Sequence, residues 1–155
     1  MKKLLLTIGF IGLSLVVFLG CKKSNSDSGI QSRHNGTTSH NNGEICTTCH
    51  QAGGSASEYK WVMAGSVYNE TGISMNPNGM IYLWTGVSGN GDLKATLEVD
   101  GKGNFFTTYS VIPSGSVYPQ VINAAGTGVK NMPLPVTTGN CNGCHGVSTG
   151  KIWVP

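Results

Sequence analysis

Apolar and polar positions alternate along much of the chain, in short segments separated by glycine-rich turns. The clearest segment is 93–99, in which Leu93, Ala95, Leu97 and Val99 alternate with Lys, Thr and Glu. A period of two places the apolar side chains on one face of a β-strand and the polar ones on the other. Further strands are predicted where aromatic and β-branched residues gather, in segments 59–68, 80–85, 105–111 and 116–122.

The turns between these segments are rich in Asn, Asp and Gly, as in "NETG", "NPNG", "SGNGD" and "DGKGN". "DGKGN" lies directly between segments 93–99 and 105–111, so it predicts a hairpin. Pro119 lacks a backbone N–H, and it predicts that segment 116–122 is an edge strand or contains a bulge. Short strands at this spacing predict a mainly β fold, an antiparallel sandwich of the immunoglobulin or transthyretin type.

The composition agrees with one modest domain of strands and turns. Of the 155 residues, 23 are Gly and 11% are charged, which favours turns and strands over long helices. Ten basic residues against seven acidic ones give a formal net charge of +3, and Lys2 and Lys3 supply two of the positive charges. The rest of the chain has no basic patch, so nucleic acid is not an expected partner.

Residues 1–20 resemble an export signal, because Lys2 and Lys3 precede an apolar run that ends in a small residue directly before Cys21. The run is short for a transmembrane span of about 20 residues. "FLGC" resembles the cleavage box of bacterial lipoproteins, which implies that Cys21 becomes the lipidated first residue and anchors the protein to a membrane. Lys22 resembles the sorting pattern for the outer membrane, facing the periplasm or the cell surface; the inner membrane stays open.

Residues 21–44 are predicted to form the lipidated cysteine and a flexible tether. This stretch is rich in Ser, Asn and Gly, and it has too little apolar surface to order itself. Two histidines, His34 and His40, stand out in it. Residues 45–155 are predicted to form one β-sandwich domain.

Four of the five cysteines belong to two copies of one motif, "CTTCH" at 46–50 and "CNGCH" at 141–145. In a helical turn, residues i, i+3 and i+4 lie on one face, so the two thiols and the imidazole of each copy can point the same way. This spacing is that of c-type haem attachment, in which the thiols form thioethers with the haem vinyl groups and the histidine binds iron. The sequence predicts two covalently attached haems, held by Cys46, Cys49, His50, Cys141, Cys144 and His145.

Other uses of the cysteine pairs agree less well with this pattern. A thioredoxin-like redox site needs a βαβ context that the strand pattern lacks. A zinc site built from both pairs would need them closer in the chain, and zinc does not require a histidine after each pair. A disulfide within each pair would leave both histidines without a role. Zinc and disulfides remain the alternatives to haem.

Each haem iron can take a sixth ligand. His34 and His40 are the two histidines outside the motifs, so their number fits one distal histidine for each iron, with His40 preferred because it lies nearer to the expected domain. The alternative is that both are merely solvated. Met132, in "NMPLP", resembles the Met-Pro loop of small cytochromes c, although it precedes its CxxCH motif. Methionine would raise the reduction potential relative to a second histidine.

The stretch "AGSVYNETG…DGKGNFFTTYSV" resembles the carboxypeptidase-regulatory-like, transthyretin-like β-sandwich family, with Asp100, Gly103 and Phe105 matching its D-x-x-G-x-F motif. This resemblance implies a scaffold without chemistry of its own. The two CxxCH motifs around such a domain look like the exported di-haem and multi-haem c-type cytochromes of bacteria. That resemblance implies single-electron transfer between membrane-associated, periplasmic or surface redox partners.

Three other functions stay open. An open iron site would make the protein a haem peroxidase or a small-molecule reductase, so its status as an enzyme is undecided, although a non-catalytic electron carrier is favoured. The sandwich could instead be a binding module that recruits a redox complex or a carbohydrate through Tyr82 and Trp84. Self-assembly into a filament would have His34 or His40 bind iron in a neighbouring chain.

Overall fold

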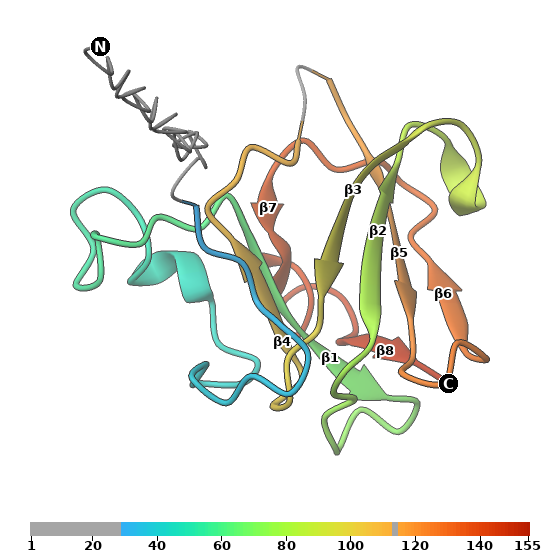
Figure 1. Ribbon diagram of the computed structural model, residues 1–155, viewed down its shortest axis with the longest axis horizontal. Helices are drawn as coiled ribbons and strands as arrows, with labels where there is room; N and C mark the ends of the chain where they lie inside the picture. Colours follow the sequence, from blue (N-terminus) through green and yellow to red (C-terminus); the bar gives the residue numbers. More distant parts are fainter. Residues whose placement is uncertain (1–28, 113–114) are drawn as a thin grey trace, which may run out of the picture.

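The computed structural model describes residues 29–112 and 115–155, and within them eight strands form two four-stranded sheets (Figure 1). Three short 3₁₀ turns make up the other regular elements of these residues. Apolar side chains of both sheets pack together, so the prediction of a mainly β sandwich with short helical turns is confirmed. In the described part of the chain, no helix is long and apolar enough to cross a membrane.

The central strand of the first sheet is β1 (Met63–Asn69). On one edge it pairs antiparallel with β4 (Asn104–Thr107). Its other pairings are parallel: β7 (Gly139–Asn140) lies beside the start of β1, and β8 (Ile152–Val154) lies beside its end. The chain between β7 and β8 contains the second CxxCH motif, so these pairings bring that motif to the middle of β1.

The second sheet has the strand order β3-β2-β5-β6 and is antiparallel throughout. Its strands are β2 (Met80–Trp84), β3 (Leu93–Glu98), β5 (Tyr118–Ile122) and β6 (Val129–Asn131). Every second residue of β2 is buried, and the residues between them are partly exposed on the outer face of the sheet. This alternation is the one that a half-buried strand requires.

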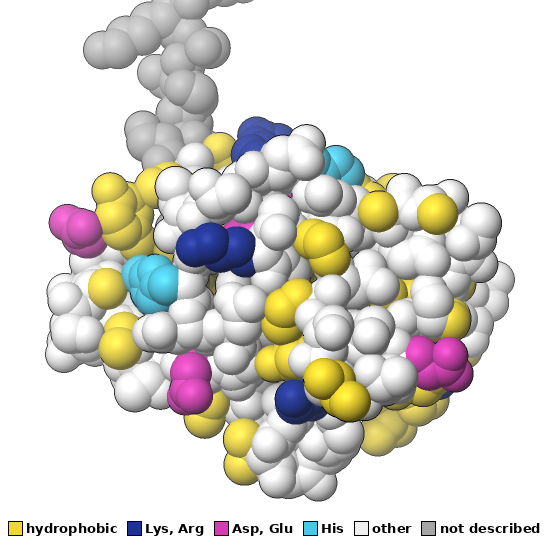
Figure 2. Space-filling model, turned by 90° about the horizontal axis from the view of Figure 1, so that it is seen from below, with side chains coloured by type: hydrophobic (Ala, Val, Ile, Leu, Met, Phe, Trp, Pro, Cys, Tyr) yellow, Lys and Arg dark blue, Asp and Glu magenta, His cyan; other side chains and the backbone are white. Residues whose placement is uncertain are grey.

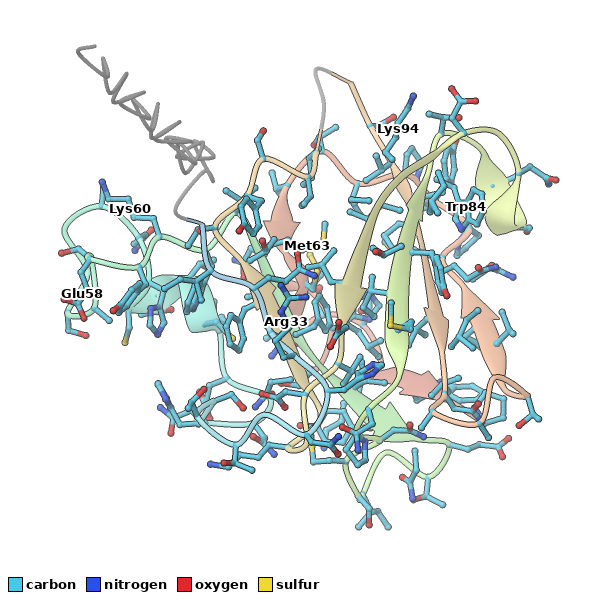
Figure 3. The ribbon with its side chains drawn as sticks, viewed as in Figure 1. Arg33, Glu58, Lys60, Met63, Trp84 and Lys94 are labelled. Atoms are coloured by element: carbon cyan, nitrogen blue, oxygen red, sulfur yellow. The ribbon has the colours of Figure 1, made fainter. Side chains whose placement is uncertain are left out.

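One hydrophobic core lies between the sheets. Met63 of β1 is fully buried, and in Figure 3 it lies near the centre of the molecule. Leu97 and Val99 are also fully buried, as the alternation in segment 93–99 predicts. Complete burial of one such side chain stabilises the fold by about 1.5–3 kcal/mol. The other core residues are Val67, Ile81, Leu83, Phe105, Val111, Val117, Val121 and Val154.

The turn "DGKGN" connects β3 to β4, which lie in different sheets, so the hairpin prediction is wrong. The Asp100 carboxylate accepts hydrogen bonds from the N–H groups of Lys102 (2.8 Å) and Asn104 (3.0 Å). Gly103 has a left-handed φ of 85°, which glycine adopts without strain. The closed turn carries the chain from one sheet to the other, and Phe105 then enters the core. The D-x-x-G-x-F residues therefore have structural roles.

Pro119 lies in an internal strand, because β5 pairs with both β2 and β6. The prediction of an edge strand or a bulge is wrong at this position. The carbonyl of Pro119 accepts a hydrogen bond from the N–H of Met132 at 2.9 Å. This contact uses the carbonyl of Pro119, so the backbone N–H that proline lacks is not needed there. The sequence did not predict β6, β7 and β8, which are only two or three residues long.

Residues 29–44 pack on the sandwich, which differs from the predicted tether. Ser32 is buried, and its hydroxyl donates to the carbonyl of Glu98 at 2.6 Å. Gln31 forms a β-bridge with Thr107 of β4. Hydrogen bonds to strand edges order this polar segment in place of apolar burial, which composition alone does not reveal. The predicted export signal and the lipidated Cys21 lie outside the described residues.

Candidate functional site

The two CxxCH motifs adopt nearly the same backbone turn. The first begins with the 3₁₀ turn η1 (Cys46–Thr48) and the second with η3 (Cys141–Gly143). In each turn the N–H of the motif histidine donates to the carbonyl of the first cysteine, at 3.0 Å in both. The predicted grouping of two thiols and one imidazole on a single helical turn is therefore present twice.

Both motif histidines are oriented by a backbone carbonyl. The Nδ1 atom of His50 lies 3.1 Å from the carbonyl oxygen of Tyr59, and that of His145 lies 2.7 Å from the carbonyl oxygen of Gly150. A carbonyl only accepts, so Nδ1 carries the proton in each ring and Nε2 keeps its lone pair. Metal-binding histidines usually show this arrangement, because the second hydrogen bond sets the tautomer and the ring orientation.

The four cysteines are free thiols with unequal exposure. The second cysteine of each motif, Cys49 or Cys144, is exposed, whereas the first, Cys46 or Cys141, is partly buried. Burial raises the pKa of the Cys46 thiol. Burial, together with repulsion from the nearby Cys46 and Cys144, raises the pKa of Cys141 to about 12. The effect of Cys46 on Cys141 means that the two motifs, far apart in the sequence, are neighbours in space.

The side chain of Asn142, between the two cysteines of the second motif, joins the motifs. It is 2% exposed. Its amide N–H donates to the carbonyl of Glu44 (2.8 Å), two residues before Cys46, and its oxygen accepts the N–H of Ser66 (3.1 Å) in β1. Ser66 lies in the gap between the segments of β1 that pair with β7 and β8. Asn142 therefore gives the backbone N–H of Ser66 a hydrogen-bond partner on this edge of β1, and it aligns both motifs.

Gly65 lets the second motif approach β1 closely. A Cβ atom at this position would lie 2.6 Å from the ring of Phe105 and 3.0 Å from the Cβ of Cys141. A side chain at residue 65 would therefore displace either the core or the motif.

A buried polar network extends from Asn142 to the loop that contains His40. The Ser66 hydroxyl donates to Asn104 (2.6 Å), and the Asn104 amide N–H donates to Ser39 (3.0 Å) and Asn42 (2.7 Å). These residues lie on either side of His40 in the sequence. The network therefore holds the His40 loop against β1 and β4, next to the first motif.

Aromatic rings surround the first motif. The ring of His50 lies 5.9 Å from that of His40 and 4.6 Å from that of Trp61, and Trp61 in turn lies 4.7 Å from Phe106. Residues 51–62 loop back around the motif, and Figure 3 shows Glu58 and Lys60 on the outside of this loop. A cavity of about 440 Å³ opens beside the cluster, with His40, Cys46, Tyr59 and Trp61 among its lining residues.

The second motif lines a cavity of about 370 Å³ between β6 and β8, within the range of sites for small ligands. Cys144 and His145 line this cavity, and so does Met132, which follows β6. Lys130 and Lys151 also line this cavity, whereas no acidic residue does so among those described. The structure thus brings Met132 to the second motif and His40 to the first.

His34 is held elsewhere. Its Nε2 atom lies 3.0 Å from the carbonyl oxygen of Gly79, and its backbone N–H donates to the Glu98 carboxylate at 2.6 Å. That hydrogen bond is the largest of several effects that lower the pKa of Glu98. These contacts give His34 a structural position, and they do not join it to either motif.

A haem would need fewer ligands from the protein than a bare metal ion would. Among the described residues, no group of three or more His, Cys, Asp or Glu side chains could hold a metal ion. A porphyrin supplies four of the iron ligands itself, so one or two protein ligands suffice. Both motifs place an exposed thiol, a partly buried thiol and an oriented imidazole on one turn. The second motif lines its cavity with both thiols and the imidazole, whereas the first contributes only Cys46 to the lining.

Sequence reasoning missed Asn142 and Trp61. The position of Asn142 inside the motif was a signal, but a polar residue between two cysteines is ordinarily exposed. Trp61 follows the first motif within the predicted strand 59–68, and nothing in the pattern distinguishes a ring beside a histidine from a core ring.

Comparisons with models of protein families, with curated proteins and with solved structures find no match to this chain.

Proposed function

We propose that this protein is a di-haem c-type cytochrome that carries single electrons between redox partners at a bacterial membrane. The observation that carries the proposal is the duplicated ligand arrangement, in which both motif histidines hold Nδ1 against a carbonyl and keep Nε2 for a metal. Each haem, when attached, would supply an iron that changes by one electron between its ferrous and ferric states.

The chain itself would attach each haem, orient it and shield it. The thiols of Cys46, Cys49, Cys141 and Cys144 would form the thioether links, and His50 and His145 would be the proximal ligands. The aromatic cluster at the first motif would limit the access of water. Asn142 would hold the two attachment sites side by side, which favours electron transfer from one to the other within a single protein.

The proposed location follows from the N-terminus. Lipidation at Cys21 would anchor the exported protein, at the outer membrane by the expectation from Lys22. On the face shown in Figure 2, basic and acidic side chains are scattered and neither sign dominates. The haem carboxylates would then supply a negative region, for which a basic face on a partner protein is the complement.

The test is the intact mass and the reduced-minus-oxidised optical spectrum of the protein produced with a c-type maturation system. We expect two covalent haems in the natural sequence, and one in each double variant, Cys46→Ser with Cys49→Ser or Cys141→Ser with Cys144→Ser. Thr48→Ala, at an exposed position between two cysteines, is the matched control and should keep both haems. A folded protein of unmodified mass would refute the proposal.

A further inference from the structure

We infer that the two irons take different sixth ligands, His40 at the first motif and Met132 at the second. This inference rests on the proposed function, because it concerns the haems that the motifs would hold. It assigns two metal ligands from the contacts of this chain, and it predicts which of the two haems has the higher reduction potential.

At the first motif, His40 is positioned before any cofactor is present. Its ring lies 5.9 Å from the ring of His50, and in the described part of the chain it makes no side-chain hydrogen bond. The residues around it are held firmly: the Lys102 ammonium donates to the carbonyl of Ser39 (2.8 Å), and Asn104 contacts both Ser39 and Asn42. An imidazole held beside the proximal histidine, with both ring nitrogens available, is suited to bind the same iron.

At the second motif, the candidate sixth ligand is Met132, which lines the cavity. Met132 shares the cavity with Cys144 and His145, and its backbone is held by the hydrogen bond to Pro119 at 2.9 Å. His145 is the one histidine among the described lining residues of this cavity. A thioether is therefore the available ligand, and haem iron accepts methionine as the axial partner of histidine.

Met63 is the rival, because it also lines the second cavity. It is 0% exposed, however, and belongs to the core between the sheets. Moving its side chain to an iron would leave a cavity in the core, whereas Met132 is partly exposed and can turn without that cost.

Unequal ligands give the electron a direction. Methionine raises the reduction potential relative to a second histidine, and the ammonium of Lys130, which lies over the Trp153 ring in the cavity lining, also favours the reduced iron. One electron would pass from the first haem to the second. The first haem would thereby be oxidised and the second reduced. The donor and the final acceptor are redox proteins that exchange single electrons with the first and second site, respectively.

The experiment is a redox titration of the di-haem protein, followed optically and by electron paramagnetic resonance, after mass analysis has established two haems. We expect two separate potentials, and a sulfur-to-iron charge-transfer band from one ferric haem only. Met132→His should abolish the band and lower only the higher potential. His40→Ala should convert the other haem from low spin to high spin.

Met63→Leu and His34→Ala are the controls, and both should leave the band and the two spin states unchanged. Loss of the band in Met63→Leu, or its persistence in Met132→His, would overturn the assignment at the second site. An unchanged spectrum in His40→Ala would overturn it at the first. Two haems by mass with no band would also refute the inference while the proposed function stands, whereas absence of covalent haem would refute both.

Discussion

The two CxxCH motifs share a backbone turn and an orientation of the histidine, but they lie in different surroundings. The first lies in an aromatic cluster beside a histidine, whereas the second lines a cavity with a methionine and two lysines. The five residues of a motif therefore form the turn, and a carbonyl from outside the motif orients its imidazole. The properties of the iron would depend on neighbours that come from other parts of the chain.

The largest expected difference between the motifs is in thiol reactivity. In protein produced without haem attachment, we expect Cys141 to be alkylated most slowly, because only the thiolate reacts. Its pKa of about 12, against an ordinary value of 9.0, reduces the thiolate fraction about a thousandfold at neutral pH. The exposed Cys49 and Cys144 should react first. The check is timed alkylation with mass analysis of each cysteine.

The pH dependence of this reaction follows from the same pKa. Burial favours the neutral thiol in the folded state, so the alkylation rate of Cys141 should keep rising about tenfold per pH unit above pH 9. A rate for Cys141 that levels off near pH 9 would show that burial does not raise the pKa of its thiol.

Asn142→Ala tests the link between the motifs. Loss of the buried amide leaves the N–H of Ser66 and the carbonyl of Glu44 without their partner, so we expect the free energy of unfolding to fall by about 3 kcal/mol. Urea unfolding of the protein without haem measures this change. Asn131→Ala, which removes one exposed hydrogen bond to Gln120, is the matched control and should cost less than about 1 kcal/mol.

Glu98→Gln tests whether His34 is structural. The lowered pKa of Glu98, due first to the His34 backbone N–H, means that the carboxylate stabilises the fold above its unfolded pKa of about 4.5. That contribution is lost as the pH falls through the lower folded value. We expect the variant to be about 1 kcal/mol less stable at pH 7, and this difference to shrink as the pH falls below about 4.5. Neither haem spectrum should change; a change in one would place His34 at an iron.

The smallest expected effect is that of Lys130→Gln. The Lys130 ammonium lies 3.6 Å from the centre of the Trp153 ring, a contact that stabilises by about 0.5–1 kcal/mol at exposed sites. We expect a loss of stability of that size and a lower potential at the second haem alone. Lys94→Gln, on β3 at the opposite edge of the same sheet, is the control in the same titration. An equal shift of the potential in that variant would contradict a local role of Lys130.

The sequence predicted the local part of the site and most of the sandwich. The CxxCH spacing predicted the turn, and the alternation of segment 93–99 predicted the burial of Leu97 and Val99, although Leu93 at the start of the segment is exposed. It did not predict that β1 pairs with β7 and β8, because strands of two or three residues carry no periodicity. The packing of residues 29–44 was also missed, since hydrogen bonds between polar side chains and strand edges leave no pattern in composition.

The parallel pairing of β1 with β7 and β8 has a consequence for the order of events in the cell. β1 is synthesised early, but these two partners come from residues 139–154, and closing so long a loop is slow. Until that closure, Cys141 remains in water with ordinary acidity. We expect folding to set a time limit for maturation, with the cofactor joined to Cys141 before the last strands associate with β1.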